Sequence, residues 1–219
     1  MKMTKKKVFV TALAICLVAI LSMGSLAWFN ASDTITNKFK IADSDGDGTP
    51  DFSVDVWEND PENPDPTKKD QDGVTYDDIA PGDKLAKNPT VENTGDYDQW
   101  IRVYVTFDDW AVIKTACKNQ GISSDVRTWL DVDTTAWTED NNATVVANNT
   151  VTYVYYYNYK LVKDQTAVLF NNVTIPGKFE QEDMKFTSGN FTITVKAEAL
   201  QADNTGDNAQ SAFANYWIK

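Results

Sequence analysis

Acidic residues alternate with small residues over positions 43–51, in a spacing typical of calcium-binding loops. Carboxylates stand at Asp43, Asp45, Asp47 and Asp51, and Gly48 follows the third of them, where a sharp turn is needed. A hard cation such as Ca²⁺ takes about six to eight oxygen ligands, and the repulsion between these carboxylates is tolerable only when the ion is bound. The sequence therefore predicts a structural Ca²⁺ held by these four aspartates.

The predicted loop departs from a complete EF-hand at its twelfth position, which should supply a bidentate Glu but is Val54. Its spacing is closer to the short aspartate-rich loops of thrombospondin type 3 repeats. A weaker signal for a second ion follows at Asp70, Asp72, Asp77 and Asp78. A solvated acidic linker is the alternative interpretation of this region, which we delimit as residues 43–78.

Catalytic side chains are scarce in this chain. Histidine is absent, which excludes a Ser-His-Asp triad, a Cys-His pair and an HExxH zinc site. Cys16 lies in the leader described below, so Cys117 is the one remaining cysteine, and we interpret it as a small apolar residue on a helix face. No pair of carboxylates stands out from the acidic background as a glycosidase pair. We therefore expect no enzymatic activity.

The charge balance argues against a nucleic-acid partner. The chain of 219 residues has 20 Lys and Arg against 32 Asp and Glu, a net charge of −12. Residues 1–27 contribute four lysines and no acid, so the remaining 192 residues carry a net charge of −16. A polyanion of that size repels phosphate backbones. A hydrophobic fraction of 42% is enough to fill one core, which excludes wholesale disorder.

The N-terminus reads as an export signal. Lys5, Lys6 and Lys7 precede an uncharged run from residue 8 to residue 29, and Gly24 interrupts this run near its end. Ser25-Leu26-Ala27 places small residues at both positions that a signal peptidase requires, which predicts a cut between Ala27 and Trp28. The alternative is an uncleaved membrane anchor, because the run is long enough to span a bilayer. We therefore expect the chain to touch the membrane only through its uncleaved signal.

The rest of the chain shows the alternation of half-buried β-strands. The strongest segments are 100–107, 151–162 and 191–199, and shorter candidates are 53–57, 90–92, 143–147 and 167–174. Helices are predicted only over about 109–118 and 208–216. Many short strands with regular turn signals indicate an all-β fold, with two packed antiparallel sheets and one or two short helices.

Several stretches together resemble the TasA/camelysin family of exported proteins, whose leaders are cut by the signal peptidase SipW. The leader similarity is Gly24-Ser25-Leu26-Ala27 followed by the aromatics Trp28 and Phe29, with the cut after Ala27. Downstream, similar blocks follow in order at residues 80–83, 91–95, 101–105, 155–161, 166–176 and 193–201. The resemblance covers most of the chain, with residues 43–78 as an insertion.

The resemblance implies a jelly-roll-like β-sandwich and assembly into extracellular biofilm-matrix fibres of a Gram-positive-like bacterium. In such fibres the freed N-terminal segment of one subunit completes the sheet of the next. Family members are also described as metallo-endopeptidases, but zinc prefers imidazole and thiolate ligands, and this chain has no imidazole. The expected partners are therefore a SipW-like peptidase during export and further copies of the chain in a head-to-tail filament.

Residues 28–42 contain the candidate donor strand. The alternation over 34–41 places Ile35, Phe39 and Ile41 on one side, with Asn37 as the one interruption of the apolar row. An edge strand exposes unpaired N–H and C=O groups, so an extended segment from a neighbour gains hydrogen bonds and buries alternate side chains. Pairing within the same molecule and a disordered tail are the alternatives.

A second interpretation of function stays open, a monomeric surface adhesin that binds carbohydrate or protein. It would use exposed aromatics, of which Trp129, Trp137 and the run from Tyr155 to Tyr159 are the candidates. Core and cross-strand packing is the competing explanation for the same aromatics. In either case the domain body comprises residues 79–219 together with a strand at 52–57.

Overall fold

The computed structural model describes residues 30–34, 52–59, 69, 71, 76, 79–184 and 191–216. The described elements, in chain order, are β1 (Asn30–Thr34), β2 (Val54–Trp57), β3 (Lys84–Ala86), β4 (Thr90–Asn93), β5 (Gln99–Phe107), α2 (Trp110–Asn119), η1 (Val126–Trp129), β6 (Trp137–Glu139), β7 (Val145–Ala147), β8 (Thr150–Tyr157), β9 (Thr166–Val168), β10 (Asn172–Thr174), η2 (Gln181–Met184), β11 (Ile193–Gln201) and α3 (Ala209–Tyr216).

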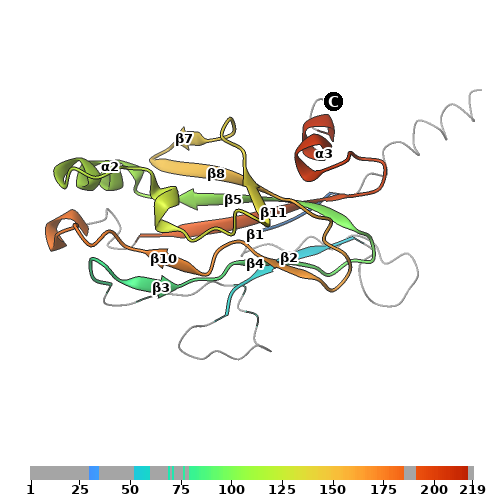
Figure 1. The fold of residues 1–219 in the computed structure, drawn as a ribbon, viewed down its shortest axis with the longest axis horizontal. Coiled ribbons are helices and arrows are strands. Elements are labelled where there is room, and N and C mark those ends of the chain that lie inside the picture. Colours follow the sequence, from blue (N-terminus) through green and yellow to red (C-terminus); the bar gives the residue numbers. More distant parts are fainter. Residues whose placement is uncertain are drawn as a thin grey trace, which may run out of the picture.

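The larger sheet has six strands, all paired antiparallel. Its order is β1-β11-β5-β8-β6, and β7 also pairs with β8. At one side of this sheet the neighbours are far apart in the sequence, since β11 inserts between β1 and β5. The second layer lies beneath this sheet in Figure 1 and contains β2, β4 and β9 beside β3 and β10. The predicted all-β fold of antiparallel sheets in a sandwich-like arrangement is confirmed.

The second layer behaves as one interrupted sheet. Ala86 lies opposite Asn172 and Thr90 lies opposite Val168, so the β3–β10 and β4–β9 ladders share the same register. The interruption falls at residues 87–89, where Pro89 has no N–H to donate. Two hydrogen bonds still cross the gap, from the Lys87 N–H to the Asn171 carbonyl at 3.1 Å and from the Leu169 N–H to the Pro89 carbonyl at 3.1 Å.

The main core lies between the two layers, on the inner face of the large sheet. Ile101, Val103, Val105 and Phe107 of β5 are all fully buried there, as the alternation of this strand predicts. The matching inward rows are Val151, Tyr153 and Tyr155 on β8 and Val195, Ala197 and Ala199 on β11. Alternation therefore predicted correctly which side of each long strand faces the core.

A second, smaller core covers the outer face of the large sheet. Helix α3 lies over this face (Figure 1), and Phe213 packs there with Trp100, Val154, Tyr156 and Leu200. Both predicted helices are present, since α2 spans Trp110–Asn119 and α3 spans Ala209–Tyr216. Cys117 lies on the buried face of α2 with 1% of its surface exposed, as predicted.

Two of the predicted strands differ from the observed ones. The strand predicted over 151–162 ends at Tyr157, after which Tyr159 is exposed and Leu161 forms an isolated bridge with Gln99. The strand predicted over 167–174 is two strands, β9 and β10, because the chain pairs with β4 first and with β3 after the interruption opposite Pro89. An apolar run alone does not show where its pairing partner is interrupted.

Candidate assembly edge

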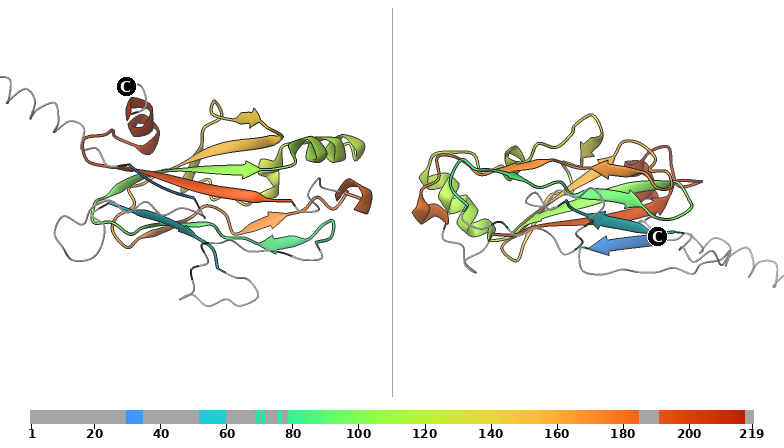
Figure 2. Two further views of the ribbon diagram at one scale, coloured as in Figure 1. Left: turned by 180° about the vertical axis from the view of Figure 1, so that it is seen from behind. Right: turned by 90° about the horizontal axis from the view of Figure 1, so that it is seen from below.

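The N-terminal strand β1 lies along one edge of the large sheet. All five of its residues pair antiparallel with β11, from Asn30 opposite Leu200 to Thr34 opposite Lys196. Figure 2 shows β1, in blue, at the margin of the sandwich beside β2. We call this pair of strands, β1 and residues 196–200 of β11, the assembly edge. Strand β1 lies within the predicted segment 28–42, although only Thr34 belongs to the alternating stretch 34–41.

The register of β1 pairs Ala31 with Ala199 and Asp33 with Ala197, and both of these alanines of β11 belong to the main core. Sequence reasoning missed residues 30–33 because Asn, Ala, Ser and Asp form no apolar row. The available sequence signal for a strand here was weak, since it consisted of the small residues of β1, which pair with the alanines of β11.

The predicted donor residues Ile35, Phe39 and Ile41 lie outside the described residues. The described ladder of β1 ends at Thr34, opposite Lys196. The role of Ile35, Phe39 and Ile41 as donor residues therefore stays a prediction.

A polar cluster stands on the outer face directly beside the assembly edge. Glu198, opposite Ser32 of β1, accepts hydrogen bonds from Arg102 Nη2 at 2.6 Å, Lys196 Nζ at 2.8 Å and the Tyr104 hydroxyl at 3.1 Å. Burial alone would raise the pKa of Glu198, but the hydrogen bonds from Lys196 and Arg102 outweigh it and lower that pKa. Burial and the neighbouring Glu198 carboxylate raise the pKa of Tyr104, which keeps its hydroxyl protonated.

Arg102 connects this cluster to helix α3. Its guanidinium carbon lies 4.3 Å from the centroid of the Phe213 ring and 5.2 Å from that of the Tyr104 ring. Stacking of this kind stabilises a partly buried cation by about 0.5–2 kcal/mol. The cluster therefore fixes the outer face of β5 and β11, so that β11 presents a rigid edge to the strand that pairs with it.

The predicted calcium ligands Asp43, Asp45, Asp47 and Asp51 lie outside the described residues, as do Asp70, Asp72, Asp77 and Asp78. Ala27 and Trp28, at the predicted cleavage site, also lie outside them. The calcium site and the cleavage site thus stay predictions. In the described part of the chain, no helix is both long and apolar enough to cross a bilayer.

A buried ion pair involves Glu58, which lies directly after strand β2 and within the segment 43–78. Lys87 Nζ contacts the Glu58 carboxylate, whose side chain is 0% exposed. The Asn59 N–H donates to Asn88 Oδ1 at 3.0 Å, which continues the link between these two segments. Lys87 lies in the three-residue interruption before β4, so the pair joins β2 to the middle of the second layer.

The aromatics that were candidates for an exposed binding surface are mostly packed inside. Trp129 is 5% exposed and Trp137 2% exposed, and the Trp137 indole N–H donates to the Val168 carbonyl at 2.8 Å. Tyr155 and Tyr156 are buried as well, whereas Tyr159 is 57% exposed. Of the two interpretations of Trp129 and Trp137, their burial supports core packing, because both fill the core around Phe107 and Tyr157.

Cys117 is suited to packing rather than to reactivity. Burial, and to a lesser degree the nearby Asp183 carboxylate, raises the pKa of its thiol. A thiol with a raised pKa stays protonated and is a poor nucleophile. The interpretation of Cys117 as an apolar helix residue agrees with this environment.

Comparisons with family models, with curated proteins and with solved structures find no match to this chain.

Proposed function

We propose that the chain is an exported structural subunit of extracellular biofilm-matrix fibres, similar to the TasA/camelysin family, and that it assembles by donating its N-terminal strand to a neighbouring copy. The single observation that carries the proposal is the pairing of β1. The first described strand of the chain is itself the edge strand of the large sheet and makes a continuous five-residue ladder with β11.

The same ladder can form within one chain or between two chains. A strand donated by a neighbour makes the hydrogen bonds that β1 makes in its own molecule, so the exchange costs little enthalpy. Residues 35–51 connect β1 to the next described segment, and these 17 residues reach at most about 60 Å when fully extended. The connection is therefore long enough for β1 to leave its own β11 and to pair with that of a neighbour.

Exchange of this kind produces a filament rather than a closed dimer when it runs head to tail. Each subunit offers one donor strand and one acceptor edge, which are different surfaces, and such heterologous contacts stay open unless the rotation closes a ring. Cleavage after Ala27 frees the donor segment from the membrane, so removal of the signal also permits assembly. This places the working protein outside the cell, in the matrix or at the cell surface.

A calcium ion in the 43–51 loop would stiffen the connection between β1 and β2. The loop lies between the two strands in the sequence, and β2 packs beside β1 and β11. We propose that Ca²⁺ held by Asp43, Asp45, Asp47 and Asp51 sets the direction in which the donor segment leaves the body. The alternative function, a monomeric adhesin using Trp129 and Trp137, receives no support from their burial.

Electron microscopy of the chain that begins at Trp28 tests the proposal. We expect filaments from this chain and none from a variant lacking residues 28–41. Ala31→Pro should also prevent assembly, because Ala31 pairs with Ala199, whose backbone groups face β1, so proline removes one N–H from the ladder. Ala31→Ser is the matched control and should assemble normally. Filaments formed by the deletion variant would show that assembly does not use the N-terminal strand.

A further inference from the structure

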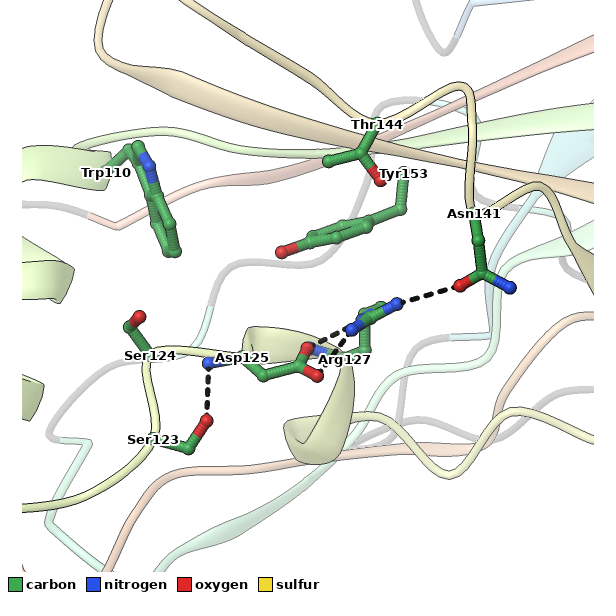
Figure 3. A pocket seen from close by; sticks show the side chains of 8 residues that line it. All are labelled: Trp110, Ser123, Ser124, Asp125, Arg127, Asn141, Thr144 and Tyr153. Carbon is green, nitrogen blue, oxygen red and sulfur yellow. Dashed lines mark hydrogen bonds and ion pairs between the residues drawn. The ribbon is translucent and has the colours of Figure 1, made fainter.

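A shallow cavity of about 440 Å³, wide open to solvent, lies beside the first turn of helix α2. Trp110, Tyr153, Arg127 and Asn141 are among its lining residues, and Figure 3 shows them facing a common space. They come from four different elements, which are α2, β8, η1 and the loop between β6 and β7. The volume falls within the range of about 300–1,000 Å³ that is typical of small-molecule sites.

The wall formed by Trp110 is held in place by the β7–β8 turn. The Trp110 N–H donates to the Asn149 carbonyl at 2.8 Å, and the Ala111 N–H donates to Asn149 Oδ1 at 2.7 Å. These bonds occupy two of the N–H groups that a helix leaves unpaired at its start. The cavity is therefore preformed, with Trp110 fixed relative to Tyr153 of the next strand.

The floor formed by Arg127 is also rigid. Its Nε and Nη2 atoms each donate to an oxygen of Asp125 at 2.6 Å, and its Nη1 donates to Glu139 Oε1 at 2.6 Å. Asn141 Oδ1 accepts a further bond from Nη1 at 3.3 Å, which orients the amide of Asn141 with its nitrogen free. A site whose side chains are already ordered loses little conformational entropy when a ligand binds.

The lining carries no net charge. Asp125 and Arg127 are its only two charged residues, and they neutralise each other in a two-pronged ion pair. Glu139, which does not line the cavity, forms a second ion pair with the Nη1 side of the guanidinium. Arg127 therefore has no charge to spare for a phosphate or carboxylate ligand, and the site favours a neutral one.

Several polar groups of the lining have hydrogen-bonding capacity left over. Within the described part of the chain, no hydrogen bond is made by the hydroxyls of Tyr153, Ser124 and Thr144 or by the amide nitrogen of Asn141. Tyr153 is only 6% exposed, and its hydroxyl points into the cavity in Figure 3. The hydroxyl is open to the solvent in the cavity, so it can donate to or accept from a ligand atom that enters there.

We propose that this cavity binds a neutral saccharide. A sugar ring presents an apolar C–H face to an aromatic wall such as Trp110, while its hydroxyls both donate and accept at its rim. The unpaired groups around the cavity match that pattern, since three hydroxyls can do both and Asn141 can donate. The inference is independent of strand exchange, because none of the lining residues belongs to β1 or β11.

Isothermal titration of the exported chain with neutral trisaccharides tests the site, using maltotriose, cellotriose, mannotriose and chitotriose as probes. We expect at least one to bind, and we expect Tyr153→Phe and Asn141→Ala each to weaken that binding roughly 3- to 10-fold through loss of one hydrogen bond. Tyr159→Phe is the matched control, because Tyr159 is exposed and lies outside the lining. It should bind with unchanged affinity.

Three results would overturn the inference. They are no heat of binding with any of the four sugars at millimolar concentration, equal weakening by Tyr159→Phe and Tyr153→Phe, and binding of trigalacturonate, an acidic sugar, in preference to the neutral ones. Urea unfolding midpoints of the variants should equal that of the unmodified chain. Asn141→Ala removes an exposed side chain, so it keeps the test valid if Tyr153→Phe alters the fold.

Discussion

Glu198 is the residue whose charge contributes most directly to the order of the assembly edge. Its folded-state pKa is lowered, so its contribution to stability is complete above the unfolded value of about 4.3 and is lost as pH falls through the folded value. We predict that Glu198→Gln destabilises the chain at pH 7 and that the difference from the unmodified chain shrinks towards pH 3. Urea unfolding at both pH values measures this.

Other carboxylates also titrate in this range, since hydrogen bonds lower the pKa of Asp125 and of Asp133. The comparison between variant and unmodified chain removes their common contribution. Glu180→Gln, which changes an exposed carboxylate, is the control and should follow the unmodified chain at both pH values. A stability difference for Glu198→Gln that stays constant from pH 7 to pH 3 would contradict the assigned role.

At the residue scale, the sequence predicts which side of a strand faces the core better than it predicts which distant residues contact each other. Period-two alternation identified the core-facing residues of β5, β8 and β11 because one face of each strand is buried. It gave no sign that Glu58 and Lys87 pair in the interior, because two charged residues in polar surroundings read as surface. It also gave no sign of the cavity at Tyr153, whose lining residues lie up to 43 positions apart in the sequence.

The β7–β8 turn is the element that fixes the start of helix α2. Asn148 and Asn149 have φ angles of 50° and 62°, which is the type I′ geometry of a tight hairpin. Asn149→Ala loses the bond to the Ala111 N–H and also strains a left-handed backbone position. We predict that it destabilises the chain by about 2–3 kcal/mol. Thermal or urea unfolding measures the change.

Glycine variants separate the two contributions of the turn. Asn149→Gly loses the same hydrogen bond but accepts the positive φ, so it should cost only about 0.5–2 kcal/mol. Asn148→Gly keeps the bond and should change stability by less than about 0.5 kcal/mol. Equal losses for Asn149→Ala and Asn149→Gly would mean that the backbone at this position is not strained.

The 43–51 loop is the element whose ligand is most readily tested. A calcium ion that binds only the folded chain, present at about 100 times its dissociation constant, adds about 2.7 kcal/mol of stability. For a domain of this size that corresponds to a rise in Tm of roughly 5–10 °C. We predict such a rise between chelator and millimolar Ca²⁺, and its loss in Asp45→Asn/Asp47→Asn. An unchanged Tm would favour the solvated linker.

Element positions were mostly predictable, whereas element boundaries were not. The long strands and both helices follow from residues near to one another in the sequence, since periodicity is a local property. The ends of β8 and the division between β9 and β10 depend on where the partner strand stops, as at Pro89. The position of β1 depends on β11, which lies more than 160 residues later in the sequence.

At the scale of the whole molecule, strand β1 has two possible partners, which are the β11 strand of its own chain and the β11 strand of a neighbouring copy. The large sheet is held by the long β5, β8 and β11 strands, whereas β1 adds to it only at an edge. Loss of β1 therefore leaves the core between the layers in place. A sandwich that stays folded while its first strand is exchanged is what a fibre subunit of this kind requires.

The most direct test is a disulfide across the assembly edge. Thr34 lies opposite Lys196 in the ladder, so Thr34→Cys/Lys196→Cys reports which molecule supplies the strand. Cys117→Ala in the same chain removes the native thiol, and Thr34→Cys/Lys114→Cys is the control pair, since Lys114 lies on helix α2 away from this edge. We predict that oxidation of the unassembled chain gives monomers on a non-reducing gel, and that oxidation of filaments gives a ladder of covalent multimers. Filaments in which every disulfide is intramolecular would contradict strand donation.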